Sequence, residues 1–236
     1  MRFPPWPTCY ACCRRPTTAE HVPPRAFFPP ARNLPPGLDL RRNLITVPSC
    51  ARHNTDKADD DEYLLFVIAT SWETGPVAQH HYFTQLRPVI LAEPRVRAFF
   101  ERAKPIIVDG QLTGVYEVDQ PRVERVLGLI AKAIYFHHYR KRWHGELALV
   151  VPPFLRIRAA SSREYAEMLA TVEQGSLSLF RNDPKHGANP SAFYYQVHQE
   201  SSAPEVSLRL VFYESFAYTA VRKRALRFAK KKTGDA

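Results

Sequence analysis

Apolar and polar positions in the first 76 residues predict two short strands, a loop and a helix. The predicted elements are strands over 18–28 and 43–48, a loop over 29–36 and a helix over about 51–71. In the helix, Leu64, Leu65 and Ile68 form an apolar stripe. Eleven of the 21 prolines precede residue 50, so we expect this unit to need a metal or a second domain for stability.

After Gly75 and Pro76 the pattern becomes that of a second unit. Asp109-Gly110 separates two apolar runs, which is a hairpin signal, and Asp119 can cap a helix with apolar residues at helical spacing. The predicted elements are helices over 93–104, 121–143 and 161–172, a hairpin over 106–108 and 112–118, and strands over 146–151, 154–158, 176–180, 192–198 and 206–212. We therefore expect an α+β fold in two units, residues 1–76 and 77–236, with a mainly antiparallel sheet in the second.

The charge of the chain points toward a polyanionic partner. Its 33 basic and 23 acidic residues give a net charge of +10 and an isoelectric point near 9.6. A basic surface of this size favours nucleic acid. The basic C-terminal run supplies Arg222, Lys223 and Arg224 as candidates for phosphate contact. The same run would also suit a solubilising end, and charge alone does not exclude a protein that is merely basic.

Membrane and export signals are not expected. The longest apolar runs, residues 64–69 and 147–151, are far too short to span a bilayer. The first residues contain one charge and no apolar segment of the kind found in signal peptides. We expect a cytoplasmic protein without membrane contact.

All four cysteines lie in the first fifty residues, at spacings typical of metal ligands. Cys9 and Cys12 form one pair and Cys50 and His53 a second, which together offer zinc three thiolates and one imidazole. In a reducing compartment such a cluster favours metal over disulfides. Cys13 could replace Cys12 as a ligand. The alternative interpretation is a set of unconnected polar residues in a loop-rich segment.

An ordered set of motifs surrounds these ligand pairs. Glu20-His21 is followed by Pro23, Asn43-Leu44 comes next, and Asn54 and Lys57 follow the second pair. The whole pattern resembles the HNH endonucleases, most closely the zinc-containing subgroup that includes phage endonuclease VII, over about residues 9–63. The resemblance implies a zinc-stapled, treble-clef-like ββα-metal unit that holds one divalent cation against the scissile phosphate.

Roles follow from the resemblance, position by position. His21 matches the general base that activates water, and its ordinary pKa near 6.5 suits that task. Glu20 and Asn54 match the ligands of the catalytic cation, expected to be Mg²⁺ or Mn²⁺. Asn43 matches the middle asparagine, which holds the loop geometry and the base. Lys57 matches a basic residue near the phosphate.

The chain departs from the subgroup at three positions. His53 replaces the usual fourth cysteine, Asn54 replaces the commoner histidine, and Glu20 replaces the commoner aspartate. A rival assignment therefore gives His53 to the catalytic metal and leaves zinc absent or bound by cysteines alone. Adjacent helical residues point about 100° apart, which favours zinc on His53 and the catalytic metal on Asn54. The acidic run 59–62 is expected to be a solvated helix face.

The sequence thus predicts a metal-dependent endonuclease that hydrolyses phosphodiester bonds, with DNA as the expected substrate. One alternative is a zinc-stabilised nucleic-acid-binding module with a degenerate nuclease site. Another is an interaction protein whose C-terminal domain binds a second copy or a different protein. Magnesium-dependent nicking of plasmid separates the first from the second, and co-purification of a tight partner would favour the third.

Overall fold

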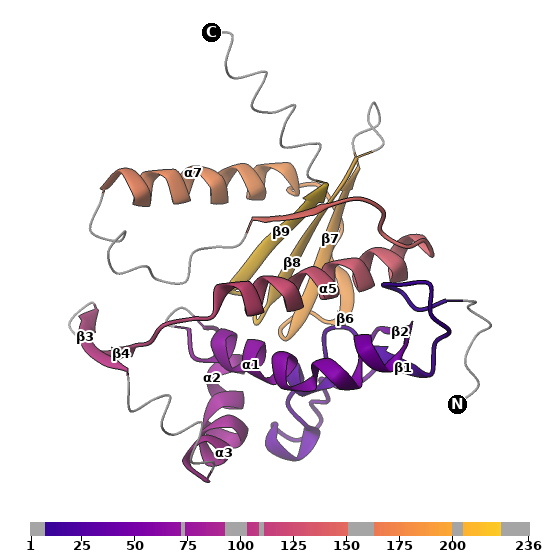
Figure 1. The fold of residues 1–236 in the computed structure, drawn as a ribbon. Coiled ribbons are helices and arrows are strands. Elements are labelled where there is room, and N and C mark those ends of the chain that lie inside the picture. Colours follow the sequence, from indigo (N-terminus) through magenta and orange to yellow (C-terminus); the bar gives the residue numbers. More distant parts are fainter. Residues whose placement is uncertain are drawn as a thin grey trace, which may run out of the picture.

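The computed structural model describes residues 8–71, 74–92, 103–108, 111–150, 163–199 and 205–222. Helices and strands are interspersed along the chain, and every strand pairing in the described residues is antiparallel. Two two-stranded sheets precede one five-stranded sheet (Figure 1). The fold is therefore α+β with antiparallel sheets, as the sequence predicts.

The N-terminal hairpin is shorter than predicted. β1 spans Thr18–His21 and β2 spans Thr46–Ser49. The segment beyond His21, predicted to continue the first strand, instead contains 3-10 turns at Arg25–Phe27 and Ala31–Asn33. This segment contains several prolines, and proline has no backbone N–H to donate to a strand ladder. The hairpin is thus reduced to four paired positions.

The predicted helix after the hairpin begins later and less regularly. Two 3-10 turns, Ala51–His53 and Thr55–Lys57, precede helix α1 at Ala58–Ala69. The residues of the predicted stripe, among them Leu64 and Ile68, are almost fully buried. The order of strand, loop, strand and helix is therefore confirmed, with the helix starting seven residues after the expected position.

Helices α2 at Pro76–His81 and α3 at Arg87–Ala92, joined by a π-helical turn at Tyr82–Leu86, were not expected. The predicted hairpin is confirmed as β3 at Lys104–Val108 and β4 at Gln111–Val115. Its turn residues 109 and 110 lie outside the described residues, as does most of the helix predicted over 93–104.

The long helix α5, at Gln120–Tyr139, follows the sequence signals closely. The Asp119 carboxylate accepts a hydrogen bond from the backbone N–H of Arg122 at 3.1 Å and caps the first turn. The helix ends at Arg140, which has a left-handed φ of 56°. α5 lies across one face of the five-stranded sheet with α1 beside it (Figure 1). Its predicted apolar face is buried at Val123, Val126, Leu127, Ile130 and Ile134.

The large sheet has the strand order β5-β9-β8-β7-β6. The strands are β5 at Leu147–Val150, β6 at His186–Asn189, β7 at Phe193–Gln199, β8 at Val206–Phe212 and β9 at Phe216–Arg222. β5, β7 and β8 match predicted strands, whereas β6 and β9 were missed. The strand predicted over 154–158 lies outside the described residues.

The strand predicted over 176–180 is wrong. Helix α7 runs through it, from Arg163 to Leu179. The alternation of Ser176 to Leu179 is only a few residues long, and the helix that starts upstream continues through it. Leu177 and Leu179 are 48% and 42% exposed, so their side chains are not buried as those of a core strand would be.

One continuous hydrophobic cluster joins the two halves of the chain. Phe27 packs against Phe212 at 5.3 Å between ring centroids, and the Tyr213 hydroxyl donates to the Phe27 carbonyl at 2.7 Å. These aromatic residues are therefore part of the core. Among the described residues, no helix combines the length and apolar character needed to cross a membrane.

Candidate functional site

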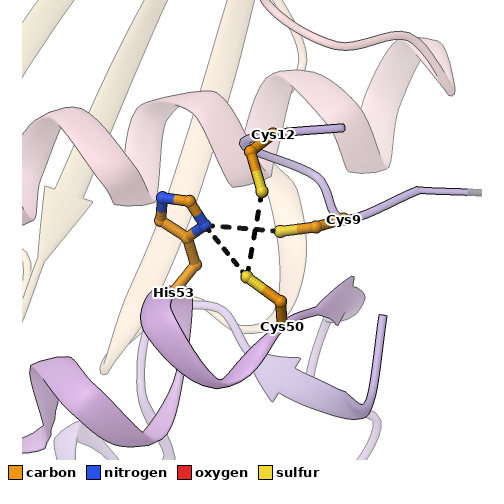
Figure 2. A group of neighbouring side chains, drawn as sticks. All are labelled: Cys9, Cys12, Cys50 and His53. Atoms are coloured by element: carbon orange, nitrogen blue, oxygen red, sulfur yellow. Dashed lines mark hydrogen bonds between the residues drawn. The ribbon is translucent and has the colours of Figure 1, made fainter. Parts of the chain in front are cut away.

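The two predicted ligand pairs meet in space. Cys9 Sγ lies 3.6 Å from His53 Nδ1, Cys50 Sγ lies 3.4 Å from the same nitrogen, and Cys12 Sγ lies 3.8 Å from Cys50 Sγ. All four ligand atoms fall within 4.8 Å of one another. Figure 2 shows the side chains pointing inward from the N-terminal loop and from the turn after β2. We call these four residues the cysteine–histidine cluster.

Local backbone bonds place the ligands. The Cys9 N–H donates to Arg14 O at 2.9 Å and folds the first pair into a tight loop, which the Tyr10 N–H fastens to Pro48 O on β2. The His53 N–H donates to Cys50 O at 3.0 Å, so the second pair forms a 3-10 turn. Both ligand pairs therefore form closed turns, and the two ligand side chains of each pair lie on the inner side of the turn.

The electrostatics of the cluster suit a soft cation. Burial, and then nearby cations led by Arg52, lower the pKa of His53, so its imidazole is neutral at pH 7 and can ligate a metal. Burial opposes ionisation of Cys50, but hydrogen bonds led by that of the His53 N–H outweigh it and lower the pKa of the thiol. The donor set of three sulfurs and one imidazole nitrogen fits tetrahedral zinc.

Cys12, rather than Cys13, supplies the fourth ligand atom. Cys13 is exposed, and all four cysteines are free thiols. The cluster could therefore bind zinc through the residues the sequence singled out. Among the histidine, cysteine and acidic side chains of the described residues, this cluster is the group whose ligand atoms lie close enough together to hold a metal ion.

A second cluster lies between β1 and the start of α1. Lys57 Nζ is 2.6 Å from Glu20 Oε1 and also contacts Asp61 Oδ2. Glu20 is 5% exposed and Lys57 7%. The remaining oxygens, Glu20 Oε2 and Asp61 Oδ1, are buried without a hydrogen-bond partner. We call Glu20, Lys57 and Asp61 the carboxylate–lysine cluster.

Burial dominates the titration of these carboxylates. It raises the pKa of Glu20 to about 7, although the Lys57 ammonium acts in the opposite direction. Burial also raises the pKa of Asp61. An unpartnered buried carboxylate oxygen is costly, so this cluster holds strong unused acceptors.

His21, the predicted general base, lies on the other face of the hairpin. Its backbone pairs with Thr46, and side chains alternate along a strand, so His21 points away from the face of Glu20. Burial, and then Arg25, lower the pKa of His21, which leaves the half-buried imidazole neutral at pH 7. Among the described contacts, no hydrogen bond or ion pair joins it to Glu20, Asn43 or Asn54.

The two predicted asparagines adopt distinct backbone states. Asn54 falls between the two 3-10 turns, where its Nδ2 donates to Thr18 Oγ1 at 2.8 Å. Its side chain therefore reaches β1 while that of the adjacent His53 joins the cysteine–histidine cluster, although the backbone is not α-helical. Asn43 has a left-handed φ of 51°, a conformation that asparagine adopts more readily than most residues.

The predicted phosphate-contacting residues are distributed differently from expectation. Lys57 is buried in the carboxylate–lysine cluster. Arg222 belongs to β9, pairs with Leu147 and places its guanidinium 5.7 Å from the Trp143 ring centroid. Lys223 and Arg224 lie outside the described residues.

The acidic run 59–62 is not the solvated face that was expected. Asp61 is buried, and Asp60 Oδ1 accepts from Arg122 Nε of α5 at 2.6 Å. Arg125 also contacts Asp60, at 3.0 Å. Two of the four acids therefore have structural partners, and those of Asp60 come from distant positions that a local pattern does not reveal.

A cavity of about 620 Å³ lies where the hairpin meets α5 and β6–β7. Its walls include residues 43–48, with Asn43, and the side chains of His137, Arg140, His186 and Tyr195. We call it the hairpin cavity. Sequence reasoning assigned these C-terminal residues no role, and the only local signal was the adjacent pair His137-His138.

No protein-family model, curated protein or solved structure matches this chain.

Proposed function

We propose that the protein is a metal-dependent endonuclease of the HNH type that hydrolyses phosphodiester bonds in DNA. The observation that supports it best is the cysteine–histidine cluster. That cluster joins the N-terminal loop to the turn that precedes Asn54, and Asn54 bonds to Thr18 on the strand that carries Glu20-His21. The net charge of +10 supports a nucleic-acid substrate.

His21 is the general base in this proposal. A base must be unprotonated when it accepts a proton from water, and the lowered pKa of His21 meets that condition at neutral pH. The residue lies at the end of β1, and the hairpin register fixes its position opposite Thr46. Below its lowered pKa, the imidazole becomes protonated and activity should be lost.

Glu20 and Asn54 are the proposed residues that hold Mg²⁺ or Mn²⁺. The buried, unpartnered Glu20 Oε2 is the donor atom that fits such an ion, and Asp61 Oδ1 adds a second free acceptor in the same cluster. When bound, the cation would stabilise charge on the phosphate and on the leaving oxygen. Lys57 holds Glu20 by its other oxygen, so in this proposal Lys57 orients the carboxylate rather than contacting DNA directly.

Plasmid nicking by the zinc-loaded protein tests the chemistry. With Mg²⁺ the parent should convert supercoiled plasmid to nicked circles, and His21→Ala should cut about 10² to 10⁴-fold more slowly. His144→Ala, which changes an exposed histidine after α5, is the matched control and should cut at the parental rate. Zinc content and DNA affinity should be equal in all three. Equal nicking by His21→Ala in a clean preparation would contradict the mechanism.

A second candidate is a zinc-stabilised DNA-binding module without nuclease activity. The observation that favours it is the ion pair between Lys57 and Glu20, which already places a cation on the proposed metal ligand. This candidate predicts DNA binding that is unaffected by Mg²⁺ and no nicking by the parent. Lys57→Met distinguishes the two, because removal of the ammonium should alter the Mg²⁺ dependence of a nuclease and leave a binding module without cleavage.

A further inference from the structure

The hairpin cavity has the size of a small-ligand site. Its volume of about 620 Å³ lies within the range of roughly 300 to 1,000 Å³ that is usual for such pockets. Residues from the hairpin form one side, and the end of α5 with β6–β7 forms the other.

One wall of the cavity consists of stacked rings. His186 and Tyr195 lie 5.1 Å apart at an interplanar angle of 25°, and their strands pair at these two residues. His138 meets His186 edge-on at 5.1 Å, and its Nδ1 lies 3.4 Å from the Tyr195 hydroxyl. Tyr195 is 3% exposed, so this wall is fixed by packing. Flat, fixed ring faces are the surfaces on which nucleic-acid bases stack.

The neighbouring wall offers hydrogen-bond donors. Arg140 occupies the left-handed C-cap of α5 and lines the cavity. A guanidinium has five N–H donors, so it can contact a phosphate through two of them beside a protein partner. His137, one turn earlier, has an Nδ1 that is buried without a hydrogen-bond partner.

The cavity also lies against the face of the hairpin that carries His21. Thr46, the strand partner of His21, belongs to its lining, and so does Ala19, two residues before His21 on the same strand face. A chain bound in the cavity would therefore continue past the proposed general base.

We propose that the hairpin cavity binds one unpaired nucleotide of the DNA strand that is cut. The base stacks on the ring of His186, which Tyr195 supports from behind, and the phosphate contacts Arg140 and His137. The inference deepens the proposed function, because it places the nucleotide beside the scissile phosphate.

The first test compares three ligands on the full-length, zinc-loaded protein without Mg²⁺. Histidine side-chain resonances are followed by NMR while thymidine 5′-monophosphate, deoxyribose 5-phosphate or thymidine is added. The monophosphate should shift His137 and His186, leave the exposed His144 unshifted, and bind at least about 5-fold more tightly than either fragment. Equal affinity for the monophosphate and deoxyribose 5-phosphate would overturn the base-stacking wall, and unmoved His137 and His186 would overturn the site.

Variants test the ring wall and the donor wall of the cavity separately. His186→Ala should lower the affinity for the monophosphate by about 5- to 150-fold, to near that for deoxyribose 5-phosphate. His186→Phe keeps a ring face, so its affinity should stay within about twofold of that of the parent. Arg140→Gln should lower the affinity for both phosphate-bearing ligands and leave the affinity for thymidine unchanged. Loss of affinity in both His186→Ala and His186→Phe, with an unchanged melting temperature, would contradict stacking.

Oligonucleotides then test the requirement for an unpaired base. A duplex with a single-base bulge should shift His186, and the fully paired duplex should not; identical responses would overturn the requirement. Because no step involves cleavage, the binding result stands apart from the nuclease proposal. His21→Ala should retain the nucleotide-induced shifts. A parent that nicks plasmid but binds no nucleotide here would refute this inference alone.

Discussion

The cysteine–histidine cluster and the carboxylate–lysine cluster both connect the N-terminal hairpin to the turns that follow it, yet they differ in charge balance. Three sulfurs and an imidazole nitrogen converge in the first, and a cation must come from outside to hold them together. In the second, Lys57 already lies against both Glu20 and Asp61. The first cluster should therefore depend on metal for its stability, whereas the second should persist without one.

The largest expected effect is the loss of zinc. Cys50→Ser removes a ligand, and structural zinc contributes on the order of 10 kcal/mol to the folding of small zinc units. We expect the variant to purify with no stoichiometric zinc and to lose the cooperative unfolding of residues 8–71. Cys13→Ser, which changes the exposed cysteine, should retain one zinc per chain. Metal analysis and calorimetry measure both; a zinc-loaded, equally stable Cys50→Ser protein would contradict the prediction.

A smaller loss should follow when the internal cation of the second cluster is removed. Lys57→Met leaves two buried carboxylates without their ion pair, and breaking a buried pair typically costs about 3–5 kcal/mol. The zinc content should stay at one per chain, which separates the two clusters. Urea unfolding at pH 8 gives the free energy, and Lys132→Met is a control at a lysine outside the cluster. A loss no larger than that of the control would mean that Lys57 contributes little.

The pH dependence of stability should report on Glu20. Its folded pKa of about 7 lies above the ordinary value of 4.5, so the folded state holds this proton more tightly than the unfolded state. Stability from this group is therefore present below pH 4.5 and is lost as pH rises toward 7, at up to about 1.4 kcal/mol per pH unit.

Glu20→Gln should flatten that slope, and Glu62→Gln, at an exposed neighbour in α1, should not. The measurement is the free energy of unfolding between pH 5.5 and 8 in magnesium-free buffer, taken as the difference between each variant and the parent. A slope unchanged by Glu20→Gln would place the titrating group elsewhere, with Asp61 as the next candidate because its pKa is also raised.

The smallest effect concerns the bond between the Asn54 turn and β1. Asn54→Ala removes the hydrogen bond to Thr18 Oγ1 and should cost about 1 kcal/mol. Thr18→Ala should cost a similar amount, and the double variant should cost less than their sum because both remove one interaction. Full additivity in this cycle, measured by urea unfolding, would show that the two side chains do not interact.

The sequence predicted the parts of the fold that local chemistry determines. The ligand pairs, the Asp119 cap and the apolar face of α5 all depend on residues a few positions apart, and each is confirmed. The long first strand was wrong because proline interrupts the ladder, and the strand over 176–180 was wrong because an upstream helix continued through a short alternation.

The second cluster and the cavity depend on contacts between distant residues. The pairing of Lys57 with Glu20 and that of Asp60 with Arg122 span long separations, so an acidic run was mistaken for a solvated face. The hairpin cavity is assembled from the hairpin, α5 and the β6–β7 pair, and no segment alone carries its pattern. The catalytic role of His21 stays a prediction, which plasmid nicking tests.

The bond between Tyr213 and Phe27 has a consequence for the order of events on the ribosome. The two residues are 186 positions apart. At about 5–20 residues per second, roughly 10 to 40 s separate their synthesis, and Phe27 emerges long before the strand that buries it. The cysteine–histidine cluster, in contrast, is complete once His53 has emerged. All four zinc ligands are therefore available to bind metal before the strand that covers Phe27 has been synthesised.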